Sequence, residues 1–297
     1  MKRKSRETIS DRVLYTIVSI VMIVITLIVL YPLIYVLSAS FSSPAAVSAG
    51  RVILLPVEFS LKGYEAVFSY KNIMKGYANT ILYTVVGTFI NVTITMFCAY
   101  PLARKRMQWK KFYSVFFLIT MYFGGGLIPT YILTSKLGLI NTRTIMFIDG
   151  ALSVYNMIVA RTFLEQSIPG DLLDAAQIDG CNDYQYFFRV ILPLSKAIIA
   201  VEVLFYAVAH WNSYFNAMIY LNDSQLYPLQ LFLRQILIMN QLNPSESMSP
   251  EVLTAMKGMS ELLKYSLIVI STAPIMFVYP FVQKYFTKGV MIGAVKG

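Results

Sequence analysis

Charged residues are scarce in this chain. Only 13% of its 297 residues are Asp, Glu, Lys or Arg, whereas 57% are hydrophobic. A soluble globular protein carries about 25% charged residues. This composition excludes a water-soluble enzyme of the same length, a disordered chain and a collagen-like chain. What remains is an integral membrane protein with several spans.

Cysteine and histidine are also nearly absent. Two cysteines, Cys98 and Cys181, are too few for a disulfide framework, and His210 is the single histidine. A Ser-His-Asp triad would depend on His210, which lies in an apolar run. No Gly-x-x-x-x-Gly-Lys-Ser/Thr phosphate-binding loop occurs either. We therefore expect no catalytic residues, no metal site and no cofactor in this chain, which is not expected to be an enzyme.

Long apolar runs dominate the rest of the sequence. A helix needs about 20 apolar residues to cross a bilayer, and its backbone must form all its hydrogen bonds internally. The first run has about 25 residues, which is longer than the roughly 7–15-residue core of a signal peptide. The sequence predicts an all-α fold with one transmembrane domain over residues 1–297 and six spans, at about residues 13–38, 78–102, 112–135, 144–163, 197–221 and 262–284.

The basic residues are divided unequally between the two sides of the membrane. With the N-terminus in the cytoplasm, 16 of the 25 Lys and Arg residues fall on the cytoplasmic side and 9 fall outside. Cytoplasmic loops carry the excess of Lys and Arg in membrane proteins. We therefore expect both termini in the cytoplasm. This distribution explains the net charge of +10 without a nucleic-acid partner.

The cytoplasmic segment at about residues 166–196 is too long for a simple turn. Pro169-Gly170 interrupts the chain before Asp171, which suits the N-cap of a short helix with Asp174 at the position of the capping box. Gly180 suits the left-handed residue that ends such a helix.

A second short helix is expected after this turn. Asn182 suits its N-cap with Gln185 at the box position, and Pro193 is expected to stop it. We predict a helix-turn-helix that either docks into a groove of another protein or packs against its own bundle, and both alternatives stay open. Four acids cluster in it: Asp171, Asp174, Asp179 and Asp183.

The fifth predicted span carries polar side chains on one broad face. At about 100° per residue, these side chains form a stripe made of Glu202, Tyr206, His210, Ser213 and Asn216. The stripe either lines a pathway for a polar solute or forms hydrogen bonds to neighbouring helices. For Glu202, near the cytoplasmic end, pairing with Lys196 or Arg189 is a further alternative.

Three other features are less specific. The triplet Gly124-Gly125-Gly126 indicates either a kinked third span or very close packing. The long outer segments at about residues 41–77 and 222–261 either receive a soluble partner or cover the bundle. Asp149, near the outer end of the fourth span, is expected to be a loop or cap residue.

The cytoplasmic segment resembles the EAA signature of ABC importer permeases. That signature reads Glu-Ala-Ala, three residues, Gly, nine residues, Ile, one residue, Leu-Pro. The spacing is kept by Asp174-Ala175-Ala176, Gly180 and Leu192-Pro193, while Asp174 replaces Glu and Val190 replaces Ile. Both replacements preserve charge or shape.

The resemblance extends over almost the whole chain. Residues 124–129, 137–142 and 279–297 are similar to the corresponding parts of oligosaccharide importer permeases. That branch is similar to the smaller maltose-type permease subunit, and its closer relatives include permeases for fragments of acidic polysaccharides such as alginate or pectin.

The resemblance implies a permease subunit of an ABC importer that moves an oligosaccharide across the bacterial cytoplasmic (inner) membrane. It implies a second permease as heterodimer partner, two ATPase subunits that bind ATP and Mg, and an extracytoplasmic solute-binding protein. The implied ATPase-coupling residues are Asp171, Asp174, Ala175, Ala176, Gly180, Leu192 and Pro193. The implied tail contacts with the ATPase are Lys288, Gly289, Gly293 and Lys296.

Two rival functions are open at this stage. Glu202 and His210 in one span are compatible with a secondary transporter driven by protons. The EAA spacing and the lack of a visible internal repeat argue against that class. The other rival is a membrane scaffold or sensor without transport activity.

Overall fold

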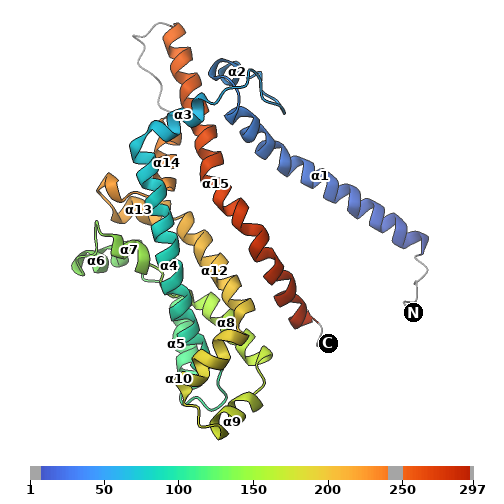
Figure 1. Cartoon of the computed structure of the whole chain (residues 1–297), viewed down its shortest axis with the longest axis vertical. Helices are drawn as coiled ribbons and strands as arrows, with labels where there is room; N and C mark the ends of the chain where they lie inside the picture. The colour runs from blue at the N-terminus through green and yellow to red at the C-terminus, as the bar shows by residue number, and fades with distance from the viewer. Residues whose placement is uncertain (1–7, 240–249, 295–297) are drawn as a thin grey trace. The chain divides into compact units, whose positions relative to one another are not determined.

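The computed structural model of this chain describes residues 8–239 and 250–294, and this part of the chain contains helices and no strands. By contacts it divides into two compact units. The first unit comprises Met1–Tyr70 and Gln235–Ser271, and the second comprises Lys71–Arg234 and Thr272–Gly297. Figure 1 labels the helices of both units. The prediction of an all-helical fold is confirmed for the described residues.

The first unit begins with α1 (Ile9–Ser40), which is long and apolar enough to cross a membrane. The backbone N–H of Thr8 donates to the carboxylate of Asp11 at 3.0 Å, which gives one backbone donor at the start of the helix its hydrogen-bond partner. The helix is exposed over residues 8–34 and buried only at residues 38–40. Such an exposed apolar surface requires lipid or another protein around it.

The C-terminal turn of α1 packs with α2 (Pro44–Ser48), α3 (Lys62–Ser69) and the first part of α15 (Pro250–Ala294). The core that α1, α2 and α15 share with the loop after α2 contains Ala39, Ala46, Val47, Val52 and Leu262. Glycine lets the backbones approach closely here. A Cβ atom at Gly258 would lie 2.7 Å from the carbonyl oxygen of Pro44 and 2.5 Å from the Oγ of Ser48.

The second unit is built around α4 (Lys71–Ala103), against which α8 (Val154–Ser167) and α12 (Lys196–Trp211) pack (Figure 1). The remaining elements of this unit are α5 (Lys110–Tyr122), α6 (Leu127–Lys136), α7 (Arg143–Ile148), α9 (Asp171–Ile178), α10 (Asp183–Tyr186), the π-helical turn η1 (Phe187–Ile191), α11 (Leu192–Leu194), α13 (Tyr214–Tyr220), the 3₁₀ turn η2 (Ser224–Leu226) and α14 (Leu229–Met239). The end of α14 and the first part of α15 belong to the first unit.

Fewer spans are visible than the six that the sequence predicts. Three helices are long and apolar enough to cross a membrane, at Ile9–Ser40, Lys71–Ala103 and Gly258–Pro280. Two bent helix pairs raise the number to as many as five if each pair is one span. The count of six therefore stays a prediction. The fourth and fifth apolar runs are each divided into two shorter helices, which lowers the number of long helices.

The fourth run is interrupted in its N-terminal half. Helix α7 ends at Ile148 and α8 begins at Val154, so the apolar stretch is not one helix. Asp149 is the C-cap residue of α7, as expected for a cap. Ser153 caps α8 by accepting a hydrogen bond from the N–H of Asn156 at 3.3 Å.

The fifth run breaks after Trp211. The Nδ2 of Asn212 donates to the carbonyl of Val208 at 2.9 Å, and the Oγ of Ser213 donates to the carbonyl of His210 at 2.6 Å. Side chains that bond to nearby carbonyls compete with the helical backbone pattern. The helix therefore ends here, and α13 starts afresh at Tyr214.

The third run is kinked at its glycines. Helices α5 and α6 are bent by 109° across the break that holds Gly124, Gly125 and Gly126. Gly126 has φ +84°, a left-handed backbone that favours glycine. No atom lies within 4 Å of a Cβ built at Gly124 or Gly126. Within the described chain the triplet is thus a kink and not a site of close packing.

An ion cluster joins α5 to α8 near the end of the fourth run. The carboxylate of Glu165 accepts from the Nζ of Lys110 at 2.7 Å and from the Nε of Arg161 at 3.1 Å. Arg161 also donates to the Oγ of Ser114 at 3.0 Å. Partial burial acts to raise the pKa of Glu165, but the two cations outweigh it and hold that pKa below its ordinary value.

We expect Gly258→Ala to destabilise the protein by about 1–3 kcal/mol, because the new Cβ overlaps a backbone carbonyl that cannot move aside cheaply. The matched control is Gly124→Ala, whose Cβ meets open space and whose effect should stay within about 0.5 kcal/mol. Thermal unfolding in detergent measures both. Equal melting temperatures for the two variants would contradict the packing described for α15 and α2.

We expect the stability contributed by Glu165 to depend on pH. Because its pKa is lower in the folded protein, the contribution is present at neutral pH and is lost as the pH falls below about 4. The difference in melting temperature between the wild type and Glu165→Gln should therefore stay nearly constant from pH 7 to about pH 5 and shrink as the pH falls below about 4. A difference that does not shrink below about pH 4 would show that the ion cluster does not stabilise the fold.

Candidate functional site

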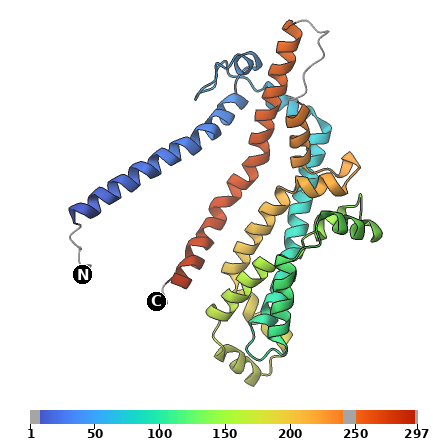
Figure 2. The same ribbon diagram turned by 180° about the vertical axis from the view of Figure 1, so that it is seen from behind.

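The helix-turn-helix between α8 and α12 lies at one end of the second unit. Figures 1 and 2 show α9 at the end of this unit opposite to α13 and α14. Helix α9 has eight residues, and the second helix runs through α10, η1 and α11 from Asp183 to Leu194. The predicted helix-turn-helix is therefore present. Its axis then bends by 79° into α12.

Gly180 forms the turn between the two helices. Its φ of +77° is left-handed, as the sequence predicts. The N–H of Cys181 bonds to the carbonyl of Ala176 at 2.9 Å, and the N–H of Gly180 bonds to the carbonyl of Gln177 at 3.1 Å. These two bonds make a Schellman motif, which satisfies the last carbonyls of α9 and sets the direction of the chain.

The second helix starts with the predicted capping box. The N–H of Gln185 donates to Oδ1 of Asn182 at 2.8 Å, and the N–H of Asn182 donates to Oε1 of Gln185 at 3.0 Å. This reciprocal pair fixes the start of the helix immediately after the Gly180 turn.

Two details of the predicted helix ends are wrong by one residue. Gly170 is the N-cap of α9, so Asp171 is its first helical residue, where a carboxylate still suits the positive end of the helix. Pro193 does not stop the second helix, which continues to Leu194. The π-helical turn at Phe187–Ile191 changes the pattern of backbone hydrogen bonds just before Pro193. The N–H that proline lacks therefore interrupts no regular series of α-helical hydrogen bonds.

The second helix is fastened to α4. Arg104 forms an ion pair with Asp183 at 2.6 Å. The ring of Phe187 stacks on Phe97 with centroids 5.0 Å apart and contacts Tyr100 at 5.2 Å. The second helix is therefore attached to α4 by a packed aromatic cluster and to the residue that follows α4 by one ion pair. The sequence analysis did not identify Arg104 as a contact of this helix. The one feature that could have pointed to it is its place in the basic loop after the second predicted span.

Helix α9 has one inner and one outer face. Leu173 and Ala176 pack partly against the core of the unit. Asp171, Asp174 and Ala175 are exposed, and Ile178 is 87% exposed. Of the four clustered acids, Asp183 is held by Arg104, and the other three face away from the core. This outer face combines negative charge with an apolar side chain, which suits docking against a basic cleft.

The polar stripe of α12 faces its neighbours inside the unit. Tyr206 is buried, and its hydroxyl bonds to the Oγ1 of Thr95 at 2.7 Å and accepts from the N–H of Ser153 at 3.1 Å. The hydroxyl thereby joins α12 to α4 and to the start of α8. The interhelical hydrogen bonds that the sequence left open are thus present at Tyr206.

His210 lies one turn further along α12. Its Nε2 is 3.5 Å from the Oδ1 of Asn91 on α4. The imidazole packs directly on α4 at Gly87, where a Cβ would lie 2.4 Å from the ring. Glycine at this position is what lets the ring approach the backbone so closely.

Glu202 is fully buried one turn before Tyr206. Neither carboxylate oxygen has a hydrogen-bond partner among the described residues. The pairing with Lys196 or Arg189 that the sequence left open is therefore not formed. An unpartnered buried carboxyl group lowers the stability of this packing.

Ser213 and Asn216 do not continue the stripe, because α12 ends at Trp211. Both side chains are partly exposed. Ser213 caps the carbonyl of His210, and the Nδ2 of Asn216 donates to the Oδ2 of Asp149 at 2.6 Å. The assumption of one continuous helix from residue 202 to residue 216 is wrong.

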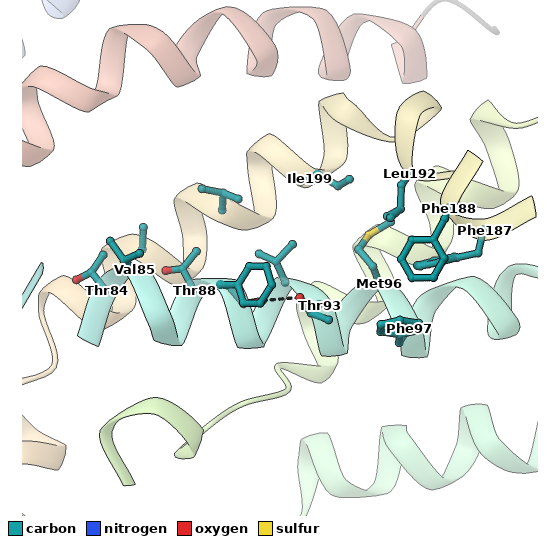
Figure 3. Close-up of a pocket in the computed structure, with 14 residues that line it drawn as sticks. Thr84, Val85, Thr88, Thr93, Met96, Phe97, Phe187, Phe188, Leu192 and Ile199 are labelled. Carbon is teal, nitrogen blue, oxygen red and sulfur yellow. Dashed lines mark hydrogen bonds between the residues drawn. The ribbon is translucent and has the colours of Figure 1, made fainter. Parts of the chain in front are cut away.

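A groove of about 730 Å³ runs along α4 between α12 and the π-helical turn (Figure 3). Its lining is almost entirely apolar, so it offers few groups that could hydrogen-bond a sugar. At one end it reaches Phe187 and Phe188 of the helix-turn-helix. The labelled lining residues are Thr84, Val85, Thr88, Thr93, Met96, Phe97, Phe187, Phe188, Leu192 and Ile199.

Part of the predicted tail contact lies outside the described residues. Lys296 is not described, and of Lys288, Gly289 and Gly293 only the helical backbone of α15 is described. These four residues stay a prediction. Residues 8–239 and 250–294 hold no group of His, Cys, Asp and Glu that could bind a metal ion.

Curated relatives match nearly the whole chain. It is 37% identical over 270 residues to Protein LplC of Bacillus subtilis, a match that covers 91% of this chain and 90% of LplC. It is 37% identical over 276 residues to the polygalacturonan/rhamnogalacturonan transport system permease protein YtcP of the same organism, covering 93% of this chain and 96% of YtcP.

A solved structure has the same fold. It is the crystal structure of a bacterial ABC transporter involved in the import of the acidic polysaccharide alginate. One of its chains is 35% identical to this chain with a TM-score of 0.86, and the match covers 95% of this chain and 100% of that chain. No protein-family profile matches this chain.

We expect Tyr206→Phe to destabilise the protein by about 1–2 kcal/mol, because it removes two interhelical hydrogen bonds and leaves the N–H of Ser153 without its acceptor. The control is Tyr131→Phe, whose ring stacks on Tyr220 and is 40% exposed. Thermal unfolding in detergent compares the two. A melting temperature for Tyr206→Phe no lower than that of the control would show that these bonds do not hold α12 in place.

Proposed function

This chain belongs to the permease subunits of ABC transporters that import sugars, and from that premise we propose that it carries an acidic oligosaccharide across the bacterial cytoplasmic membrane. It is a multi-pass membrane protein and not an enzyme, because the permeases of this family leave ATP hydrolysis to a separate subunit. We propose that this chain holds no cofactor of its own, and that ATP and Mg are bound by that subunit.

The acidity of the substrate rests on the relatives. YtcP is named for polygalacturonan and rhamnogalacturonan, and the transporter of the solved structure imports alginate. Each of these polymers carries carboxylate groups on its sugar rings. Both relatives are at least 35% identical to this chain over more than 90% of its length. A uronate-containing oligosaccharide is therefore the substrate class we propose.

We propose that the helix-turn-helix is the element that couples transport to ATP hydrolysis. The observation that carries this proposal is its geometry: an exposed acidic helix, a left-handed turn at Gly180, and a second helix fixed to α4 by Arg104 and Phe97. The exposed face presents Asp174 for an ion pair with a basic residue of the ATPase. The coupling residues carried by the EAA spacing are Asp171, Asp174, Ala175, Ala176, Gly180, Leu192 and Pro193.

The contacts of this element suggest how movement would be transmitted. When nucleotide binding brings the ATPases together, α9 moves with the cleft in which it sits. The second helix follows because the Schellman turn joins the two. Force then reaches the spans by two routes, through the ion pair and aromatic contacts to α4 and through the chain itself into α12. Alternating access requires such a link between two states.

We propose that the coupling element faces the cytoplasm, with both termini on the same side and six spans in the assembled protein. The excess of Lys and Arg on that side supports this orientation. The predicted partners are a second permease as heterodimer partner, two ATPase subunits and an extracytoplasmic solute-binding protein. We retain Lys288, Gly289, Gly293 and Lys296 as predicted contacts with the ATPase.

The five pathway candidates divide into two groups. Ser213 and Asn216 lie at the partly exposed break after α12, and we propose that they face the pathway. Glu202, Tyr206 and His210 are buried against α4 and hold α12 in position in the conformation described here. We propose that these three reach the pathway only if α12 moves during transport.

We expect Gly180→Pro to lower the ATPase activity stimulated by the loaded binding protein at least about tenfold, equivalent to about 1.4 kcal/mol. Proline cannot adopt the positive φ of this turn, so α9 would be misdirected. The assay uses the complete complex in proteoliposomes.

The matched control is Gly138→Pro, which places the same substitution at another open position with positive φ, in the outer loop. The control should retain stimulated ATPase activity. Equal activity of the two variants would contradict the coupling assignment. Uptake that follows a proton gradient without ATP would contradict the importer.

A further inference from the structure

Helix α14 contains one charged residue, Arg234, within an otherwise apolar and amide-bearing sequence. Its side chain is partly buried. Among the described residues the guanidinium forms no ion pair and no hydrogen bond. Its recorded contact is with an aromatic ring, because the Cζ of Arg234 lies 5.9 Å from the centroid of Tyr214.

Other basic residues of the second unit are occupied by acceptors of the chain itself. Arg143 donates to the Oδ1 of Asn79 at 3.4 Å, and Lys75 donates to the Oε1 of Gln225. Arg234 differs from both. A partly buried guanidinium without an anion or acceptor is costly, and a cation–π contact recovers only part of that cost. Its five donors are available to a ligand.

Tyr214 supplies a partly exposed aromatic ring, and this guanidinium lies over it. Tyr214 is the first residue of α13 and is 42% exposed. The helix break after Trp211, where Asn212 and Ser213 bond back to α12, lies immediately before this ring in the chain. The pair therefore combines a partly exposed aromatic ring with a planar cation from a different helix.

This combination matches the chemistry of a uronate. The apolar face of a pyranose ring packs on an aromatic ring, and its carboxylate pairs with a guanidinium in a two-pronged hydrogen bond. A neutral sugar would use the aromatic face but would leave the charge without a partner. We propose that Tyr214 and Arg234 form a binding site for one uronate unit of the oligosaccharide. This inference rests on the acidic substrate proposed above.

The position of the pair is compatible with substrate entry. Helix α12 starts beside the coupling element and has 16 residues, a length of about 24 Å. Tyr214 and Arg234 belong to α13 and α14, at the end of the second unit away from α9 (Figure 2). In the proposed orientation this is the outward side. Ser213 and Asn216, the retained pathway candidates, adjoin the site in sequence.

The test measures uptake of labelled trigalacturonate by the complete complex with its binding protein in proteoliposomes. Arg234→Gln should lower uptake by about tenfold or more, because it removes a charge-assisted hydrogen bond. Arg234→Lys should restore part of the uptake, since it keeps the charge and loses the two-pronged geometry.

Matched variants separate the site from general effects. Lys136→Gln removes an exposed outer charge elsewhere and should leave uptake unchanged. Tyr214→Phe keeps the aromatic face and should retain uptake, whereas Tyr214→Leu should lose it. If Arg234→Gln fails to assemble, the comparison of Tyr214→Phe with Tyr214→Leu still decides the question.

The outcomes distinguish this site from the proposed function. If the wild-type complex imports trigalacturonate and Arg234→Gln imports it equally well, the site is wrong and the proposed function stands. If the wild type imports neither trigalacturonate nor trimannuronate but imports a neutral oligosaccharide, the acidic substrate is wrong, and the site falls with it.

Discussion

The packing of α12 against α4 is the constraint on which the rest of the second unit depends. It is made by polar groups in apolar surroundings, chiefly the hydroxyl of Tyr206 between Thr95 and Ser153 and the imidazole of His210 against Gly87 and Asn91. These contacts are directional, so they fix the rotation of α12 about its axis as well as its distance from α4. Glu202 lies on the same face and has no hydrogen-bond partner within residues 8–239 and 250–294, which makes this interface less stable than full pairing would make it.

Because α12 is held against α4, that interface fixes the positions of the two ends of the unit relative to each other. At one end, the chain of the proposed coupling element bends sharply into α12, while Phe97 of α4 and Arg104, the residue after α4, hold the same element. At the other end, Tyr214 follows the break after Trp211 and lies under Arg234. A movement imposed on α9 therefore has two routes to the helices that carry the proposed sugar site.

Much of this could be predicted from the sequence, and the rest depended on tertiary contacts. Composition and apolar runs were sufficient for an all-helical membrane protein, and local chemistry was sufficient for the Gly180 turn and the Asn182 cap, because these depend on a few neighbouring residues. The break at Asn212 was missed, since periodicity assumes an unbroken helix and does not register side chains that bond back to their own turn. The contact of Arg234 with Tyr214 joins residues 20 positions apart across a break, and no spacing rule predicts it.

Photo-crosslinking at Ile178 tests the central claim most directly. This residue is 87% exposed on the outer face of α9, and a benzoyl-phenylalanine at this position would touch whatever binds there. The account predicts a crosslink to the ATPase subunit in the assembled complex, with a yield that changes when ATP is added, and none from Ile128, which is also exposed, on α6. Crosslinks only to lipid or within this chain, with the ATPase bound elsewhere, would contradict it.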